Sequence, residues 1–316
     1  MLERIVAEIA AHTSFLVTTH ESPDGDAVGS ALALGNYLRR LGKDVTVYLS
    51  DPLPELYAFL PMADRVVHAI PPRSFDICFV LDVGEFRRAG KELVDFKGVG
   101  AFINIDHHLH CERFGAINLI DPEAAATGCL VHRIIRAAGD EVDHDIALCI
   151  YTAVITDTGS FRYSNSNQEA FAIAGEMVAH GVNAWSVAEK LYESQPKERL
   201  ELLALALATL TVAPRGDVAS VTVTLDMYEK TGTTAELTDG FVNYPRSIRG
   251  VEVAVFFREI EPELCKVGFR SKGKVNVSAL AAEFGGGGHH NAAGCVIAGR
   301  LEEVRDKVFA HLARAL

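Results

Sequence analysis

One layout recurs four times in this chain of 316 residues: an apolar strand or helix ends directly in aspartate or histidine. These ends carry His20 with Asp24 and Asp26, then Asp82, then Asp106 with His107 and His108, and last Asp157. The carboxyl ends of neighbouring parallel strands meet along one edge of a sheet, where ligands bind in α/β proteins. The layout therefore favours an α/β fold that gathers these side chains in a small volume.

The segments between these ends alternate between strand and helix patterns. We predict strands at Ser14–Thr19, Val45–Leu49, Phe75–Leu81 and Gly100–Ile105, and helices at Ala27–Leu41 and Asp145–Ile155. Such alternation is typical of βαβ units, so it predicts a doubly wound, mainly parallel sheet.

The pattern changes after Pro214. Further strands are predicted at Val218–Leu225, Val251–Arg258 and Lys266–Arg270, and helices at Val277–Phe284 and Leu301–Leu316. We therefore expect a catalytic, metal-binding domain at 1–185, a helical connector at 186–214 and a smaller α/β domain at 215–316. Small-molecule sites often lie at domain interfaces, so a cleft is expected between the two lobes.

Charge and composition limit the classes of function. The net charge of −12 lies entirely in residues 1–214, because residues 215–316 hold 13 basic and 13 acidic side chains. This excess argues against binding to long duplex DNA, which needs many Lys and Arg contacts to phosphate. No signal peptide or apolar run of roughly 20 residues is seen, so no membrane span is predicted. The six cysteines form no Cys-x-x-Cys pair, and we expect reduced thiols in a cytoplasmic protein.

The acidic and histidine residues at the four ends predict a metal site. Carboxylates packed closely repel one another unless cations lie between them. Oxygen ligands with a minority of imidazoles suit Mn²⁺ or Mg²⁺. Two ions about 3.5–4 Å apart can share a bridging carboxylate and activate one water. We predict two divalent ions, Mn²⁺ favoured over Mg²⁺, with these ligands: His20, Asp24, Asp26, Asp82, His107 and Asp157.

Each segment alone has an ordinary explanation. Asp24-Gly25-Asp26 could be a turn followed by a helix cap, Asp82 could cap a helix, and two adjacent histidines are weak evidence by themselves. The indication comes from finding all four in this order, each at the end of an element.

Five motifs together resemble a known family. His20-x-x-x-Asp24-x-Asp26, Asp82 at a strand end, Asp106-His107-His108 and Thr156-Asp157-Thr158-Gly159 resemble the four motifs of the DHH phosphoesterases, a RecJ-like superfamily. Gly286–Gly294 (GGGHHNAAG) resembles the GGGHxxAAG motif of the accompanying DHHA1 domain. The likeness is greatest to the bacterial nanoRNase subgroup, oligoribonucleases that also act as phosphoadenosine-phosphate phosphatases.

The resemblance implies a role for each position. His20 and Asp24 would bind one ion, and Asp26, His107 and Asp157 the other. Asp82 would bridge the two ions. His108 would act as a general acid or charge stabiliser over the scissile phosphate, and Asp106 would orient its neighbours.

The second domain is expected to hold the rest of the nucleotide. Glycines 285–288 can bring backbone N–H groups to an anion, with His289 pointing at a phosphate, or can form a flexible turn. The expected substrate contacts are Arg270, Ser271, Gly287, Gly288, His289, Arg88 and Arg246. A solvated surface role is equally open for Arg88 and Arg246. His110 stands two residues after Asp-His-His, where family members often carry Asn, so its role is open.

The resemblance implies hydrolysis of very short oligoribonucleotides to nucleoside 5′-monophosphates. The same site would remove the 3′-phosphate of 3′-phosphoadenosine 5′-phosphate. Expected partners are short single-stranded RNA or DNA and small nucleotides, and a homodimer is expected from the family. The alternatives are a cyclic- or linear-dinucleotide phosphodiesterase, a pyrophosphatase, a RecJ-type exonuclease or a non-catalytic nucleotide-binding protein.

Overall fold

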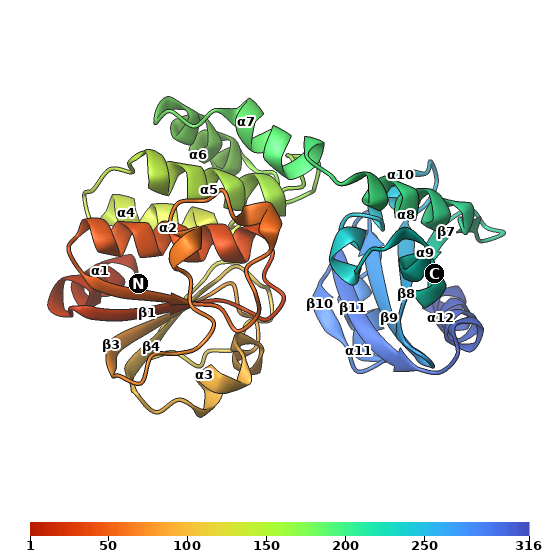
Figure 1. The fold of residues 1–316 in the computed structure, drawn as a ribbon, viewed down its shortest axis with the longest axis horizontal. Coiled ribbons are helices and arrows are strands. Elements are labelled where there is room, and N and C mark those ends of the chain that lie inside the picture. Colours follow the sequence, from red (N-terminus) through yellow and green to blue (C-terminus); the bar gives the residue numbers. More distant parts are fainter. Residues whose placement is uncertain (316) are drawn as a thin grey trace. The chain divides into compact units, whose positions relative to one another are not determined.

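The computed structural model describes residues 1–315, with all of their side chains except those of His289 and Ala315. The chain divides into two compact units, Met1–Glu193 and a second that begins at Ser194. Figure 1 shows both units with most of their helices and strands labelled.

The N-terminal unit alternates strands and helices. Its elements are α1 (Leu2–Ala11), β1 (Ser14–Thr18), α2 (Gly25–Arg40), β2 (Asp44–Tyr48), η1 (Glu55–Tyr57), η2 (Ala63–Arg65), β3 (Phe75–Leu81), η3 (Phe86–Ala89), α3 (Lys91–Asp95), β4 (Val99–Asp106), β5 (Ile117–Ile120), α4 (Thr127–Ala137), α5 (His144–Asp157), α6 (Gln168–Ala179), α7 (Ala184–Ala188) and the π-helical turn η4 (Glu189–Glu193). The predicted alternation of strand and helix is therefore present.

Five parallel strands form the sheet of this unit, in the order β2-β1-β3-β4-β5. The chain runs outward from β1 to β2 and then returns to place β3 on the other side of β1. Open α/β sheets bind ligands at such a reversal, beyond the carboxyl ends of the strands. His20 follows β1 and Asp82 follows β3, so both stand at this point.

Alternating side chains of the strands fill two cores. Phe15, Val17 and Phe79 face the core shared with α2, α4 and α5, whereas Leu16 and Val80 face the core covered by α3 and nearby turns. The helices α2, α4 and α5 lie over one face of the sheet, with α6 outside them (Figure 1). This packing fixes the strand ends, and therefore the side chains that follow them.

The C-terminal unit is built on a mixed sheet. Its elements are α8 (Lys197–Ala208), β6 (Thr211–Val212), β7 (Val218–Val223), α9 (Leu225–Thr231), η5 (Ala235–Thr238), α10 (Asn243–Ser247), β8 (Val253–Glu261), β9 (Leu264–Ser271), α11 (Val277–Ala282), β10 (Gly287–His289), β11 (Ala292–Ala298) and α12 (Leu301–Ala315). The strand order is β10-β11-β9-β8-β7-β6, with only the β7–β8 pair parallel.

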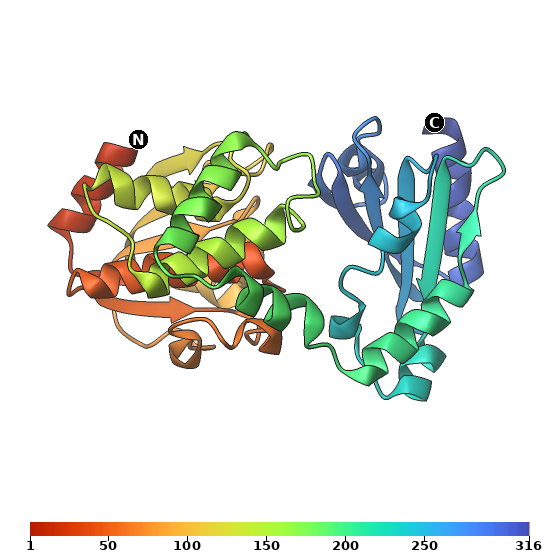
Figure 2. The ribbon, with the colours of Figure 1, turned by 90° about the horizontal axis from the view of Figure 1, so that it is seen from above.

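Helices cover both faces of this second sheet. Side chains of α11 and α12 pack on one face with Val255 and Phe257, and α8 packs on the other face with Val223 and Phe241. Figure 2 shows this unit from above, with α8 in green and α12 in dark blue. The helix α8, which falls within the predicted connector at 186–214, thus packs in the C-terminal unit.

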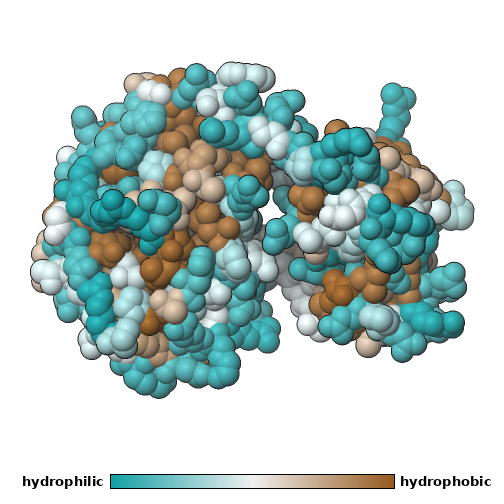
Figure 3. All heavy atoms as spheres, viewed as in Figure 1, coloured by the Kyte–Doolittle hydropathy of each residue, from teal (hydrophilic) through white to brown (hydrophobic). Residues whose placement is uncertain are grey.

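The predicted fold class is confirmed: a parallel α/β sheet is followed by a second, smaller α/β unit. Polar residues cover most of the surface in Figure 3, interrupted by apolar patches on each unit. Among the described residues, no helix combines the length and apolar character that crossing a bilayer requires.

Candidate metal centre

The first segment of the site joins β1 to α2. Asp24 is the N-cap of α2, and its Oδ1 accepts a hydrogen bond from Ala27 N at 3.1 Å. The helix-cap explanation of Asp24 therefore holds, and the cap also fixes the carboxylate next to His20. The ring of His20 contacts the Glu21 carbonyl through Nδ1 at 2.8 Å, which leaves Nε2 facing Asp82 at 3.6 Å.

Asp26 lies in the first turn of α2 and is fully buried. Its Oδ1 accepts hydrogen bonds from Ser30 Oγ at 2.8 Å and Gly128 N at 3.0 Å, and its Oδ2 accepts one from Thr127 N at 2.6 Å. Backbone N–H groups at the start of α4 thus hold this carboxylate. Its Oδ2 also lies 3.7 Å from His107 Nε2.

Asp82 directly follows β3 with a backbone φ of 59°. Residues other than glycine rarely adopt this left-handed region, and when they do they concentrate at functional sites. The backbone is held there by the Asp82 N–H bond to the Ile105 carbonyl at 2.9 Å. The conformation turns the chain out of the sheet just where the carboxylate is needed.

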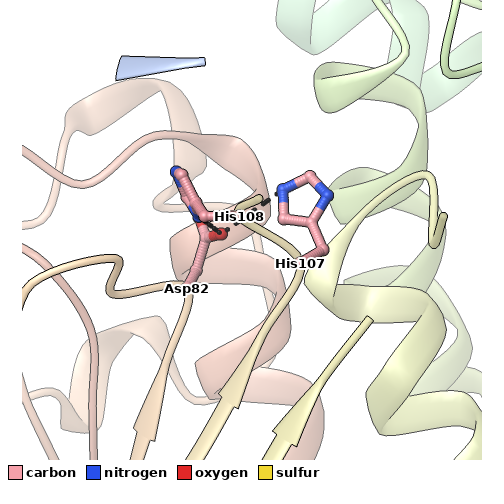
Figure 4. A group of neighbouring side chains, drawn as sticks. All are labelled: Asp82, His107 and His108. Atoms are coloured by element: carbon pink, nitrogen blue, oxygen red, sulfur yellow. Dashed lines mark ion pairs between the residues drawn. The ribbon is translucent and has the colours of Figure 1, made fainter. Parts of the chain in front are cut away.

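The end of β4 supplies two imidazoles to the same carboxylate. His107 Nε2 and His108 Nδ1 each lie 3.6 Å from Asp82 Oδ1. Figure 4 shows both rings beside this carboxylate. Asp106 is fully buried, and its Oδ1 accepts a hydrogen bond from the His108 backbone N–H and lies 2.6 Å from His108 Nδ1. Asp106 therefore holds the ring of His108.

Asp157 is the last residue of α5 and approaches the cluster from the helical layer. Its Oδ2 lies 3.7 Å from His107 Nε2 and accepts a hydrogen bond from Asn165 Nδ2 at 3.0 Å. Gly25 makes this approach feasible, because a Cβ at that position would lie 2.4 Å from Thr156 Oγ1. Glycine thus lets the start of α2 touch the end of α5.

The structure brings all six predicted ligands together. Together with His108 they form three groups, and within each group the donor atoms lie within 4.8 Å of one another: His20, Asp24 and Asp82; Asp26, His107 and Asp157; and Asp82, His107 and His108. Like His107, Asp82 belongs to two of these groups. Its Oδ2 faces His20, whereas its Oδ1 faces His107 and His108.

The charged side chains of the cluster shift one another's pKa values. Burial disfavours a charged imidazole, but the Asp82 and Asp24 carboxylates outweigh it and raise the pKa of His20 to about 9. In the same way Asp157, Asp82 and Asp26 overcome burial and raise the pKa of His107 to about 10. Protonated imidazoles therefore balance part of the negative charge of the carboxylates.

The carboxylates divide into two kinds. Burial raises the pKa of Asp157 to about 6, although His107 opposes the shift, and burial with the charge of Asp82 raises the pKa of Asp26 as well. Burial would do the same to Asp82, but its three imidazole neighbours lower its pKa below the usual range. Cations that bind such a site replace protons, so divalent ions fit its charge.

The donor atoms also fit a metal. Ligating histidines usually donate their second ring N–H to a carbonyl or carboxylate, which turns the other nitrogen toward the ion. His107 Nδ1 contacts the Ala124 carbonyl at 3.1 Å, and His20 Nδ1 contacts that of Glu21, so both Nε2 atoms point into the cluster. Carboxylate oxygens with a few imidazoles suit Mn²⁺ or Mg²⁺.

The expected substrate contacts lie in both units. Arg88 is an exposed residue of η3, and its carbonyl accepts from Glu21 N at 2.6 Å, which ties η3 to the His20 segment. His110 is exposed in the loop that follows His108. Arg246 lies on α10 of the C-terminal unit.

The other predicted contacts share one end of the second sheet. Arg270 on β9 pairs with Ala292 on β11, which pairs with His289 on β10. Ser271 Oγ lies 3.1 Å from Asn291 Oδ1 in the same region. The side chain of His289 lies outside the described part of the chain.

The glycine-rich segment has a packing requirement of its own. Gly287–His289 forms the edge strand β10, and Gly288 has a φ of 142°. A Cβ at Gly288 would meet the Ala292 carbonyl oxygen at 2.5 Å, whereas one at Gly287 would meet nothing within 4 Å. Close pairing with β11 thus requires glycine at Gly288, and Gly287 has open space beside it.

Three polar residues of the site were missed in the sequence. Ser30, Thr127 and Asn165 donate hydrogen bonds to Asp26, Asp82 and Asp157. Nothing in their immediate sequence distinguishes them from ordinary helix or loop residues. The partial exception is Thr127, because threonine near the start of a helix is a common pattern.

Two family models match the chain. Residues 14–154 match the DHH family, N-terminal domain, and residues 217–314 match the DHHA1 domain. The fold and the cluster thus define a phosphoesterase of the DHH class. The chain belongs to the DHH family and carries its DHHA1 domain, which confirms the resemblance seen in the motifs.

Individual relatives agree with this assignment. The bifunctional oligoribonuclease and PAP phosphatase NrnA of Thermus thermophilus is 35% identical, over 99% of this chain and 95% of that protein. An exopolyphosphatase-related protein from Bacteroides fragilis has a similar structure, with a TM-score of 0.92, 31% identity and coverage of 99% and 95%. RecJ from Thermus thermophilus, solved with Mn²⁺, shares the fold at a TM-score of 0.54 and 16% identity, over 99% of this chain and 55% of RecJ.

Proposed function

We propose that this chain hydrolyses very short oligoribonucleotides to nucleoside 5′-monophosphates and removes the 3′-phosphate of 3′-phosphoadenosine 5′-phosphate. The chain is a metal-dependent phosphoesterase of the DHH family. The observation that carries the proposal is Asp82, whose two oxygens face two separate sets of ligands. The name of the Thermus relative, an oligoribonuclease and PAP phosphatase, supports the choice of substrates.

We infer two divalent ions at this site, with Mn²⁺ favoured over Mg²⁺. His20 and Asp24 would hold one, Asp26, His107 and Asp157 the other, and Asp82 would serve both, as the grouping of donor atoms supports. Bound ions supply Lewis acidity, which polarises the phosphoryl group and lowers the pKa of a coordinated water.

His108 is the proposed general acid. Burial disfavours its charged form, but the bond to Asp106 and the charge of Asp82 raise its pKa and so favour the protonated ring. In the proposed step water attacks phosphorus and releases one proton to solvent, the bond from phosphorus to the ribose 3′-oxygen breaks, and His108 gives its proton to that oxygen. Asp106 keeps the ring oriented and stabilises its charged form until the proton is transferred.

The C-terminal unit is proposed to hold the nucleotide. Arg270 offers a guanidinium suited to phosphate, and Ser271 and the backbone of Gly287 and Gly288 offer uncharged donors. His289 completes this proposed set. Arg88 and Arg246 are proposed as further contacts to phosphate. The variants Arg88→Gln and Arg246→Gln, which remove the charge, test these two contacts.

A substrate panel with purified protein and Mn²⁺ tests the proposal. The panel holds 5′-labelled RNA of two, five and 24 nucleotides, 3′-phosphoadenosine 5′-phosphate, cyclic di-AMP and pyrophosphate, with Asp157→Ala as the blank. We expect fast turnover of the dinucleotide and of 3′-phosphoadenosine 5′-phosphate, and little of the 24-mer.

The other outcomes separate the alternatives. Cleavage of cyclic di-AMP or pyrophosphate alone would keep the metal site but replace the substrates. Nucleotide binding without turnover in Mn²⁺ or Mg²⁺ would make the chain a binding protein. Light scattering of the same sample tests the homodimer that we propose for the chain in solution.

A further inference from the structure

Thr127 touches two site carboxylates that belong to different ligand groups. It is the first residue of α4 and is fully buried. Its backbone N–H donates to Asp26 Oδ2 at 2.6 Å, and its hydroxyl donates to Asp82 Oδ1 at 3.0 Å. Asp26 belongs to the group with His107 and Asp157, whereas Asp82 belongs to the group with His20 and Asp24. Thr127 is thus hydrogen-bonded to carboxylates of both ligand groups.

The hydroxyl bond decides which way the Asp82 carboxylate is rotated. The imidazole nitrogens around Asp82 lie 3.6 Å away, beyond the 2.7–3.2 Å range typical of N–H···O hydrogen bonds, whereas the Thr127 hydroxyl is at 3.0 Å. With Oδ1 held by Thr127, Oδ2 must face His20. This rotation allows the carboxylate to serve two ions, one through each oxygen.

We propose that Thr127 is a positioning residue that fixes the Asp82 carboxylate between the two ion sites and holds Asp26 beside it. This inference rests on the proposed two-ion function. Thr127 does not touch the substrate in this scheme; it acts through the carboxylates. Supporting groups of this kind commonly change metal affinity about 10–100-fold when they are removed.

Two variants separate the hydroxyl from the rest of the side chain. Thr127→Val keeps the shape and the backbone N–H but removes the donor to Asp82, whereas Thr127→Ser keeps that donor. Thr152→Val is the matched control: Thr152 is equally buried in the same unit, and its hydroxyl bonds within α5 to the Leu148 carbonyl.

Mn²⁺ binding to the full chain is measured by calorimetry, with electron paramagnetic resonance at two equivalents of Mn²⁺. The native protein should bind two ions and give the spectrum of an exchange-coupled pair. Thr127→Val should bind Mn²⁺ about 10-fold more weakly or worse and lose the coupled spectrum. Thr127→Ser and Thr152→Val should match the native protein in both readouts.

Each contrary result has a distinct meaning. Native-like affinity and coupling in Thr127→Val would overturn the inference, as would a loss in Thr127→Ser equal to that in Thr127→Val. If Thr127→Val does not fold, the comparison of Thr127→Ser with Thr127→Ala decides in the same way. A native chain that binds one ion or none would instead refute the two-ion function, and the inference with it.

Discussion

At the scale of single residues, Asp82 combines a backbone conformation and a charge that few residues could supply together. Its φ of 59° is accessible mainly to glycine, asparagine and aspartate. Its carboxylate is buried among three imidazoles and the Thr127 hydroxyl. The backbone and the side chain at this position can therefore be tested separately.

We expect Asp82→Asn to be more stable than Asp82→Ala in metal-free protein. Both variants remove the charge, but alanine in the left-handed region adds a steric cost of about 1 kcal/mol. Urea unfolding in EDTA measures the difference. Both variants should lack phosphoesterase activity.

The same two substitutions at Asp145 provide the control. Asp145 is exposed in the first turn of α5, where the backbone is helical and alanine is a better helix former than asparagine. The order of stability should therefore reverse there. If Asn and Ala rank alike at both positions, the φ of Asp82 does not influence stability.

At the scale of elements, the contact between α2 and α5 determines whether Asp24 and Asp26 reach Asp157. Gly25 is the first residue of α2, and it packs against Thr156, the residue that precedes Asp157 in α5. The two helices approach so closely here that no side chain fits at Gly25. The metal site thus depends on helix packing as well as on strand ends.

We expect Gly25→Ala to lower both stability and Mn²⁺ affinity, because the new Cβ would force α2 away from α5. A loss of about 1–3 kcal/mol is typical of overpacking. The double variant Gly25→Ala with Thr156→Gly should recover part of both losses. Thermal unfolding and Mn²⁺ titration measure them.

Gly175 is the matched control for this substitution. It lies within α6, is exposed, and has no atom within 4 Å of an added Cβ. Gly175→Ala should raise stability by up to about 1 kcal/mol, because alanine is the better helix former. Equal effects at both glycines would show that close packing at Gly25 is unimportant.

Sequence patterns predicted the elements that are long and strongly patterned. The strand Phe75–Leu81 has the predicted bounds, β1 differs from prediction by one residue at one end, and β4 is longer than predicted by one residue at each end. The short β5 was missed, because four residues carry little periodicity. The bond from Thr127 N to Asp26 spans 101 positions, so no local pattern could show it. In contrast, the ends of parallel strands converge by topology alone, which is why the approach of His20, Asp82 and His107 could be predicted.

At the scale of the whole molecule, the metal cluster and the expected nucleotide contacts are distributed unevenly. All six predicted ligands belong to Met1–Glu193, whereas Arg270, Ser271 and the glycine-rich strand belong to the C-terminal unit. Each unit also has its own hydrophobic core. Metal binding should therefore stabilise one unit directly.

We expect Mn²⁺ alone to slow amide hydrogen exchange in the N-terminal unit, above all at the ends of β1, β3 and β4, because a ligand stabilises the folded state that binds it. At about 100 times its dissociation constant, an ion adds about 2.7 kcal/mol. Exchange in β7–β9 should not change. Asp157→Ala with Mn²⁺ is the control, and equal protection of both units would contradict the expectation.

The left-handed turn at Asp82 also has an evolutionary consequence. Aspartate and asparagine codons differ by a single base, and asparagine is among the few residues that this backbone accepts. A lineage could therefore lose hydrolysis in one mutational step while the protein still folds and accumulates. Inactive descendants that retain nucleotide binding are thus within easy reach of this sequence, and the residue at position 82 is the first to inspect when a homologue is assigned an activity.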